Sequence, residues 1–279
     1  MSLTEPRYAV LPGGTRISYL EAGTEGSALP PLVLLHGMGS AARSWRDQLA
    51  GLSRDRRVVA WDAPGYGESA PLAPELPDAG DYARAVLAFI DHLGIDRCHL
   101  VGHSLGTLMA ARFAADYPER LLSVSFSGLA IGHAELPADE SRRLLHSRLD
   151  DMATLGPAGM AQKRGPRLLA PGAAPDVIAS VIETMGMAKL PGYVQAAHML
   201  SGGNALADIA RIPAGLPVQF LYALDDVITV PADNLKGAAL RPEAPAHAIR
   251  NAGHAAYLEQ PALFNDILAR FMEAHDGRP

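Results

Sequence analysis

The chain has 279 residues, of which 48% are hydrophobic and 19% are charged. This composition is typical of a globular protein with a sizeable core and excludes a disordered chain. The formal net charge is −6 and the pI is near 5.9, so the chain lacks the positive field that a phosphate backbone requires, and no nucleic-acid partner is expected.

Short apolar runs alternate with helical patterns over the first half of the chain. A Pro-Gly-Gly turn between two strand-like runs predicts a β-hairpin within residues 7–23. The run PPLVLLHG predicts a strand that is buried on both faces of a parallel sheet, and RRVVAWD, RCHLVGHS and LLSVSFSG predict further strands of that sheet. Helices are expected over residues 45–52, 81–93 and 105–117. The alternation predicts an α/β fold whose sheet carries helices on both faces.

From about Ala134 to Ala207 this alternation stops. Apolar residues stand at helical spacing without strands between them, and paired glycines and prolines interrupt them. We expect a helical cap over residues 134–207, inserted between two parts of the core, 1–133 and 208–279. The cap contains five of the nine methionines, which either pack its short helices or line an adaptable apolar pocket. They are Met152, Met160, Met185, Met187 and Met199.

The alternation resumes after the cap. LPVQFLYALDD and AHAIRNAGH predict two more strands, which gives a mostly parallel sheet of about eight strands. A helix is expected near residues 232–240, and a last amphipathic helix over residues 261–275 begins at a proline, which suits a first helical turn.

The segment GHSLG, residues 102–106, lies where a strand pattern changes to a helix pattern. A serine hydroxyl is a poor nucleophile unless a base takes its proton and the developing oxyanion is stabilised. A sharp strand-to-helix turn would lift Ser104 clear of the sheet, and Gly102 and Gly106 would let strand and helix approach. The alternative is a serine that only caps a helix. The strand-turn-helix context favours the nucleophile.

The partners of such a nucleophile are expected at the ends of the last strands. His254 lies in a glycine-led loop after the last predicted strand and is the expected base. Asp225 and Asp226 end the preceding strand, and strand alternation alone does not decide which one orients the histidine. The backbone N–H groups of Met38 and Leu105 are expected to form the oxyanion hole.

Several segments together resemble the α/β-hydrolase superfamily over nearly the whole chain. They are LLHGMGSAARSW, VVAWDAPGYGES, LVGHSLG, YPERL, LYALDD and NAGHAAYLEQPALF. The resemblance implies the α/β-hydrolase fold and a triad of Ser104, His254 and an acid. In this family the acid lies three residues after a position usually held by glycine, here Ala223, which points to Asp226. Asp62 falls in the family's structural turn and is assigned no catalysis.

The cap and its exit, ALADIARIPAGLPV, resemble enol-lactone hydrolases of the 3-oxoadipate type. An enol-lactone acid would require a cation for its carboxylate, and Lys163 and Arg164 are either that cation or part of a solvated face. The chain departs from this branch at Thr107, where a second glycine is usual. C–C bond hydrolases usually carry Pro-Gly in the oxyanion loop and tryptophan beside the histidine, where this chain has MGSA and Ala255.

These residues predict a serine hydrolase that cleaves a carboxylic ester or lactone of a small, largely apolar substrate through an acyl-enzyme. The alternatives are a C–C bond hydrolase of a meta-cleavage-type diketone and a non-catalytic ligand-binding member of the fold. The histidines show no H-x-x-x-H or H-E-x-x-H spacing, and His36 is interpreted as a structural brace, so no metal or cofactor is expected. The protein is expected to be a monomer or homodimer.

The remaining expectation concerns the compartment. Cys98 is the only cysteine, which excludes an internal disulfide and fits a reducing compartment. The opening MSLTEPRYAV lacks a basic stretch followed by an apolar core, so no signal peptide is expected. No stretch approaches the roughly 20 apolar residues of a membrane span. We therefore expect a cytoplasmic protein with no membrane partner.

Overall fold

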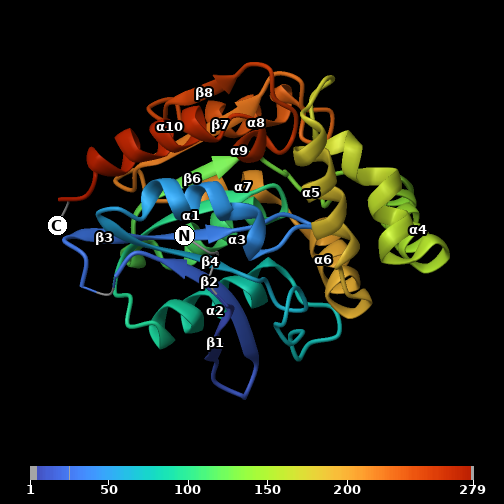
Figure 1. Ribbon diagram of the computed structural model, residues 1–279, viewed down its shortest axis with the longest axis horizontal. Coiled ribbons are helices and arrows are strands. Elements are labelled where there is room, and N and C mark those ends of the chain that lie inside the picture. Colours follow the sequence, from blue (N-terminus) through green and yellow to red (C-terminus); the bar gives the residue numbers. More distant parts are fainter. Residues whose placement is uncertain (1–4, 25, 278–279) are drawn as a thin grey trace.

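The computed structural model describes residues 5–24 and 26–277. Residues 1–4, on which the expectation of no signal peptide partly depends, lie outside this range. Within it, eight strands form one sheet in the order β1-β2-β4-β3-β5-β6-β7-β8 (Figure 1). The strands are β1 (Arg7–Val10), β2 (Arg16–Ala22), β3 (Leu29–Leu35), β4 (Arg56–Trp61), β5 (Cys98–His103), β6 (Leu121–Ser127), β7 (Val218–Ala223) and β8 (Ala246–Ile249).

Most of the strand pairs are parallel. β1 and β2 form the predicted hairpin, whose turn contains Gly13 and Gly14 at φ +86° and +87°, a conformation that favours glycine. β2 also pairs antiparallel with β4, and every later pair is parallel. The mostly parallel α/β sheet predicted from the alternation is therefore confirmed.

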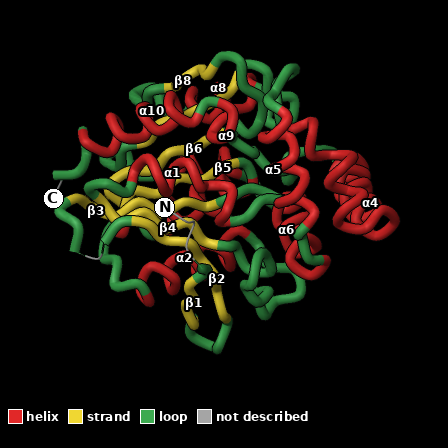
Figure 2. Tube along the Cα trace, viewed as in Figure 1, coloured by secondary structure: helices red, strands yellow, loops and turns green. Residues whose placement is uncertain are grey.

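Helices cover both faces of this sheet, as Figure 2 shows. Val33 and Leu35 of β3 pack in a core with α2 (Ala79–His92) and α3 (Leu105–Asp116). Leu32 and Leu34 point to the opposite face and pack with α1 (Arg46–Leu52) and α10 (Pro261–Glu273). Because successive side chains of a strand point to opposite faces, burial on both faces accounts for the uninterrupted apolar run.

Some element boundaries differ from those predicted. The helix expected from residue 45 is preceded by a 3-10 turn, η1 (Ala42–Trp45). α2 begins at Ala79 rather than at residue 81, because Asp78 is its N-cap and forms a capping box with Asp81 in the first turn. β8 ends at Ile249, and Asn251 then adopts φ +53°, so the run that continues to residue 254 leaves the sheet as a loop. The remaining elements are η2 (Pro118–Arg120), α8 (Pro231–Ala239) and α9 (Ala256–Glu259).

Between β6 and β7 the described chain contains helices and no strand. These are α4 (Ala138–Arg164), η3 (Gly165–Leu168), α5 (Pro175–Gly186), α6 (Leu190–Gly202) and α7 (Ala205–Arg211). α4 kinks at Gly156, which has φ +65° and is followed by Pro157. Figure 1 shows α4, α5 and α6 gathered at one end of the sheet. Across the residues described, none of the helices combines the length and the apolar character needed to cross a membrane.

The methionines of this segment take both of the roles considered. Met160 and Met185 are buried in a small core with Tyr193, and they also line the cavity described below. Met152 belongs to the same small core. Met187 is 53% exposed, because it lies at the end of α5 beyond that core.

Candidate active site

Ser104 occupies a strained turn between β5 and α3. Its φ of +51° and ψ of −120° are unusual for a residue with a side chain. A Cβ at Gly102 would lie 2.4 Å from the carbonyl oxygen of Gly106, and a Cβ at Gly106 would lie 2.3 Å from that of Leu35. Both glycines are therefore required by close backbone approach, as the sequence predicts. The turn leaves the Ser104 side chain at the amino end of α3.

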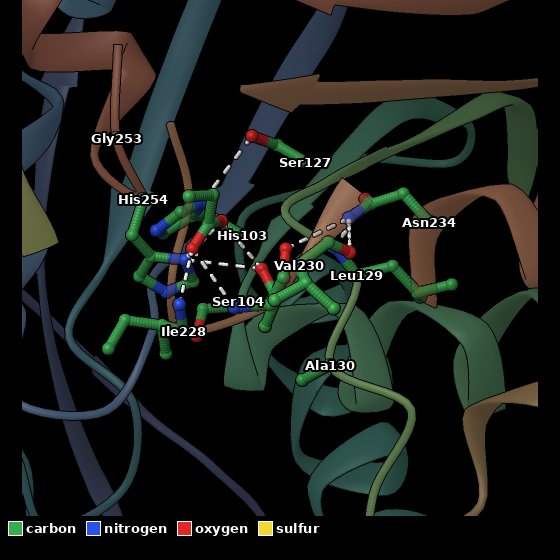
Figure 3. Close-up of polar contacts among 12 residues, drawn as sticks. His103, Ser104, Ser127, Leu129, Ala130, Ile228, Val230, Asn234, Gly253 and His254 are labelled. Carbon is green, nitrogen blue, oxygen red and sulfur yellow. Dashed lines mark hydrogen bonds and ion pairs between the residues drawn. The ribbon is translucent and has the colours of Figure 1, made fainter. Parts of the chain in front are cut away.

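His254 and Asp226 form a buried pair on the loops that follow β8 and β7. The Nδ1–H of His254 donates to Oδ2 of Asp226 across 2.8 Å, and the two side chains are 4% and 1% exposed. Asp225 is exposed, although its backbone N–H donates to the carbonyl of Ala252. The structure thus places Asp226, and not its neighbour, against the histidine. Figure 3 shows His254 close to Ser104.

The Asp226 carboxylate has further donors. Oδ1 accepts the N–H groups of Ile228 at 2.7 Å and of Thr229 at 3.0 Å, and Oδ2 accepts the Thr229 hydroxyl at 2.8 Å. Burial by itself raises the pKa of Asp226, but the hydrogen bond and charge of His254, with these other donors, outweigh it and hold that pKa below its usual value. The carboxylate therefore stays ionised at neutral pH.

Thr229 and Asn234 are part of this arrangement and were missed in the sequence. The Thr229 hydroxyl lies 3.2 Å from Nδ1 of His254 as well as beside Asp226. The Asn234 amide donates to the carbonyl of Thr229, and its oxygen accepts the N–H of Leu129 at 2.7 Å. Asp226 accepts the N–H of Ile228 two residues further on, as in an Asx turn, but that pattern identifies the aspartate and not Thr229.

His103 packs directly against His254. Their ring centroids are 4.7 Å apart, and Tyr257 lies 4.8 Å from His103 on another side. Burial, and then the nearby His254, lower the pKa of His103 well below its usual value, so His103 is neutral. Its Nδ1 contacts the Ser127 hydroxyl at 3.4 Å (Figure 3). His103 therefore serves as packing for the His254 ring.

Glu259 holds the loop that carries His254. One of its oxygens accepts the N–H of Gly253 at 2.7 Å, and the other accepts the N–H of Ala170 at 2.8 Å. Burial is the main reason that the pKa of Glu259 is raised. A single carboxylate thus ties the histidine loop to the segment that follows η3, a contact that depends on residues far apart in the chain.

The loop after β3 lies against Ser104. A Cβ at Gly37 would approach the Ser104 Cβ to 2.8 Å and its hydroxyl to 3.3 Å, so Met38 follows a residue in close contact with the serine. His36 accepts the N–H of Ala63 at Nε2 and its Nδ1 contacts the carbonyl of Gly37 at 2.8 Å, which braces the loop. Leu105 is the first residue of α3, where an amide has no intrahelical acceptor.

These groups open onto one cavity of about 560 Å³. Ser104, His254, Met38 and Leu105 all line it, together with residues of α4, η3, α5 and α6. No hydrogen bond joins the Ser104 hydroxyl to the His254 ring in the described residues. Such bonds are often long without substrate and shorten when it binds. The structure therefore places four of the five site residues proposed from the sequence in the wall of one cavity, and the fifth, Asp226, bonds to His254 without lining the cavity.

The two cap cations singled out in the sequence, Lys163 and Arg164, share one carboxylate. Lys163 donates to Oδ1 of Asp151 at 2.7 Å, and Arg164 donates to Oδ2 at 2.7 Å. Their charge and hydrogen bonds lower the pKa of Asp151, with the Lys163 hydrogen bond as the largest cause. Lys163 is 60% exposed. Arg164 reaches the cavity wall, but its charge is shared with Asp151.

The strained turn at Ser104 is a nucleophile elbow between a parallel strand and a helix, and this feature defines a class of α/β proteins. The alpha/beta hydrolase family matches residues 32–267. The chain therefore belongs to the alpha/beta hydrolase family, and its activity is that of a hydrolase.

Individual relatives agree with this assignment. The chain is 30% identical over 251 residues to a putative carbamate hydrolase RutD from Pseudomonas savastanoi pv. phaseolicola, covering 88% of this chain and 94% of that protein. The fold of the present chain is similar to that of the enol-lactonase from Burkholderia xenovorans, with a TM-score of 0.84, 24% identity, and coverage of 96% of this chain and 100% of the enol-lactonase chain. A thermophilic esterase from Thermogutta terrifontis gives a TM-score of 0.86, 22% identity, and coverage of 98% and 100%.

Proposed function

We propose that the protein hydrolyses a small carboxylic ester or lactone through an acyl-enzyme on Ser104. The observation that carries the proposal is the buried pair of Asp226 and His254 beside an elbow serine, all within reach of one cavity. Asp226 fixes the tautomer of His254 and stabilises its charged form, and the N–H groups of Met38 and Leu105 bind the oxyanion.

In this scheme the Ser104 oxygen forms a bond to the carbonyl carbon while His254 takes the serine proton. The bond to the leaving oxygen breaks, and His254 returns the proton to that oxygen. Water then attacks the acyl-enzyme, losing one proton to His254 and releasing the acid, and Ser104 regains its hydrogen. For a lactone the leaving oxygen remains attached to the product.

The cavity supports a small, mostly apolar acyl group. Leu129, Ile131 and Leu200 form part of its wall, and about 560 Å³ suits a ligand of modest size. The similarity to an enol-lactonase and an esterase in fold, and to a putative carbamate hydrolase in sequence, supports attack on a carbonyl. No contact in the described residues favours C–C bond cleavage over ester cleavage.

The test compares wild type with Ser104→Ala on p-nitrophenyl esters from acetate to octanoate, a lactone series and an aryl carbamate. We expect the variant to keep its thermal midpoint and to lose at least about 10³-fold in kcat/KM, because the serine, histidine and aspartate work as a unit. A fluorophosphonate probe should label wild type and not the variant. Turnover by the variant would refute the role of Ser104. Wild type that neither labels nor turns over would also refute the proposal and would indicate a ligand-binding protein.

A further inference from the structure

Two cations in the cavity wall, Arg148 and Arg167, have no counter-ion among the described residues, and of the two only Arg148 is partly buried. Arg148 of α4 is partly buried and lines the cavity, and its only hydrogen bond within the described residues is from Nη1 to the carbonyl of Leu144 at 3.0 Å. No described carboxylate lies within 4 Å of its guanidinium. The neighbouring cations differ, because Arg164 pairs with Asp151 and Lys236 pairs with Asp233 at 2.8 Å.

The charge of Arg148 is poorly compensated. Burial lowers the pKa of Arg148, and the nearby charge of Arg164 lowers it further, against a smaller opposite effect of Tyr193. A buried charge without a partner destabilises a protein unless something else satisfies it. The position is therefore suited to an anion supplied from outside the chain.

His133 adds an unpaired polar atom to the same wall. Its Nδ1 is buried and has no hydrogen-bond partner, while the residue lines the cavity beside Arg148. Burial, and then the charge of Arg148, lower the pKa of His133 to about 4. The ring is therefore neutral at pH 7, and its tautomers place a donor on either nitrogen.

The charged residues around the cavity also favour the binding of an anion. Of the described residues that line it, four carry a positive side chain and one carries a carboxylate. They are Arg148, Arg164, Arg167 and Lys236, with Asp233 as the carboxylate. The protein as a whole carries a net charge of −6, so this local excess of cations runs against the charge of the chain. Clefts of one sign concentrate ligands of the other.

We propose that Arg148 and His133 form an anion subsite in the cavity, and that the substrate cleaved at Ser104 carries a carboxylate that binds there. The substrate class is then the half-ester of a dicarboxylic acid, or a lactone that bears a carboxylate. This inference rests on the proposed hydrolase function for the reaction but not for the binding of the anion. A flat guanidinium presents paired N–H donors that match the two oxygens of a carboxylate.

The kinetic test uses mono-p-nitrophenyl adipate, which is an anion, and its methyl ester, which is the neutral matched substrate. We expect wild type to prefer the anion, and Arg148→Gln to reduce the ratio of kcat/KM for the anion to kcat/KM for the neutral ester about 10- to 100-fold, through the KM of the anion. Arg148→Lys should restore part of the preference. The control is Arg143→Gln on the same helix, since that side chain is 70% exposed and lies outside the cavity. Equal losses on both esters would overturn the subsite.

A binding test decides the subsite independently of turnover. In the Ser104→Ala protein, calorimetry should show monomethyl adipate binding more tightly than dimethyl adipate, with the difference removed by Arg148→Gln and reduced by added NaCl. This result with no ester turnover by wild type would uphold the subsite and refute the hydrolase. Equal affinity for the two esters, or no detectable binding of the anion, would overturn the carboxylate subsite. Inorganic phosphate that binds more tightly than monomethyl adipate would overturn it as well.

Discussion

Replacing Thr229 with valine isolates one support of the buried histidine–aspartate pair. The substitution removes a hydroxyl that donates to Asp226 Oδ2 at 2.8 Å and lies 3.2 Å from His254 Nδ1, and it nearly preserves the side-chain volume. The backbone N–H of residue 229 still reaches Asp226, and so do the Ile228 N–H and the His254 ring. One of four donors to the carboxylate is therefore lost.

The expected magnitude follows from the charge of the acceptor. A hydrogen bond to an ionised group contributes about 1.5–3 kcal/mol, and Thr229 and Asp226 are 6% and 4% exposed, so little water replaces the lost donor. We expect the free energy of unfolding at pH 7 to fall by about 1.5–3 kcal/mol. We also expect kcat/KM to fall about tenfold, which corresponds to about 1.4 kcal/mol in the barrier, because the carboxylate orients His254 less firmly.

The pH dependence of this loss provides a sign test. The pKa of Asp226 in the folded protein is lowered, so its contribution to stability is complete above the pKa of an unfolded aspartate, about 3.9, and is lost as the pH falls through the folded pKa. The stability difference between Thr229→Val and wild type should therefore be full at pH 7 and shrink below pH of about 4.

Urea denaturation at several pH values measures this difference. Thr229→Ser keeps the hydroxyl and should stay close to wild type. Thr154→Val removes an exposed hydroxyl that donates to a helix carbonyl, and it should change the free energy of unfolding by no more than about 0.5 kcal/mol. A Thr229→Val protein with wild-type stability at pH 7, or a loss that does not diminish in acid, would refute the reasoning.

Two further predictions concern charge. Asp226→Asn should keep the fold but reduce kcat about 10⁴-fold, because a neutral amide no longer holds the reactive tautomer of His254. Asp225→Asn, at the exposed neighbouring position, should leave kcat within about twofold of wild type. Ester kinetics on both variants measures the difference, and equal effects would contradict the geometry. Burial lowers the pKa of His99 in the folded protein to about 4, whereas an unfolded histidine has a pKa of about 6.5. Between these two pH values the unfolded chain binds more protons at His99 than the folded protein does. The free energy of unfolding should therefore fall by up to about 3 kcal/mol as the pH drops from about 6.5 to about 4. Urea titrations of wild type and His99→Gln should show a shallower pH dependence for the variant, and identical slopes would contradict the prediction.

Most of the fold could be predicted from the sequence, because the patterns that indicate strands and helices are local. An apolar run such as that of β3 is itself the mark of a strand buried on both faces, and the change of period at Ser104 marks the elbow directly. Element ends were less accurate. The capping box of Asp78 and Asp81 moved the start of α2, and the left-handed residue Asn251 ended the last strand early, since each depends on a backbone conformation at one position.

The choice between Asp225 and Asp226 shows where local pattern stops. Strand alternation gives the two neighbouring side chains opposite directions without choosing between them. The family resemblance points to Asp226, and the fold shows that Asp226 faces His254. The roles of four further residues could not be predicted either, because each contacts a residue that lies far away in the chain; they are Thr229, Asn234, His103 and Glu259.

The sequence by itself determined the sheet, the elbow and the proposed serine, base and acid candidates. Hydrophobic period, glycine spacing and the order of residues along the chain can all be read without knowing the tertiary structure. The tertiary structure alone decided which cations face the cavity. Lys163 and Arg164 both bind Asp151, whereas Arg148 has no counter-ion among the described residues. The physical reason is that the effective charge of a side chain depends on its neighbours in space, and helices joined by irregular turns bring together residues that no spacing rule connects.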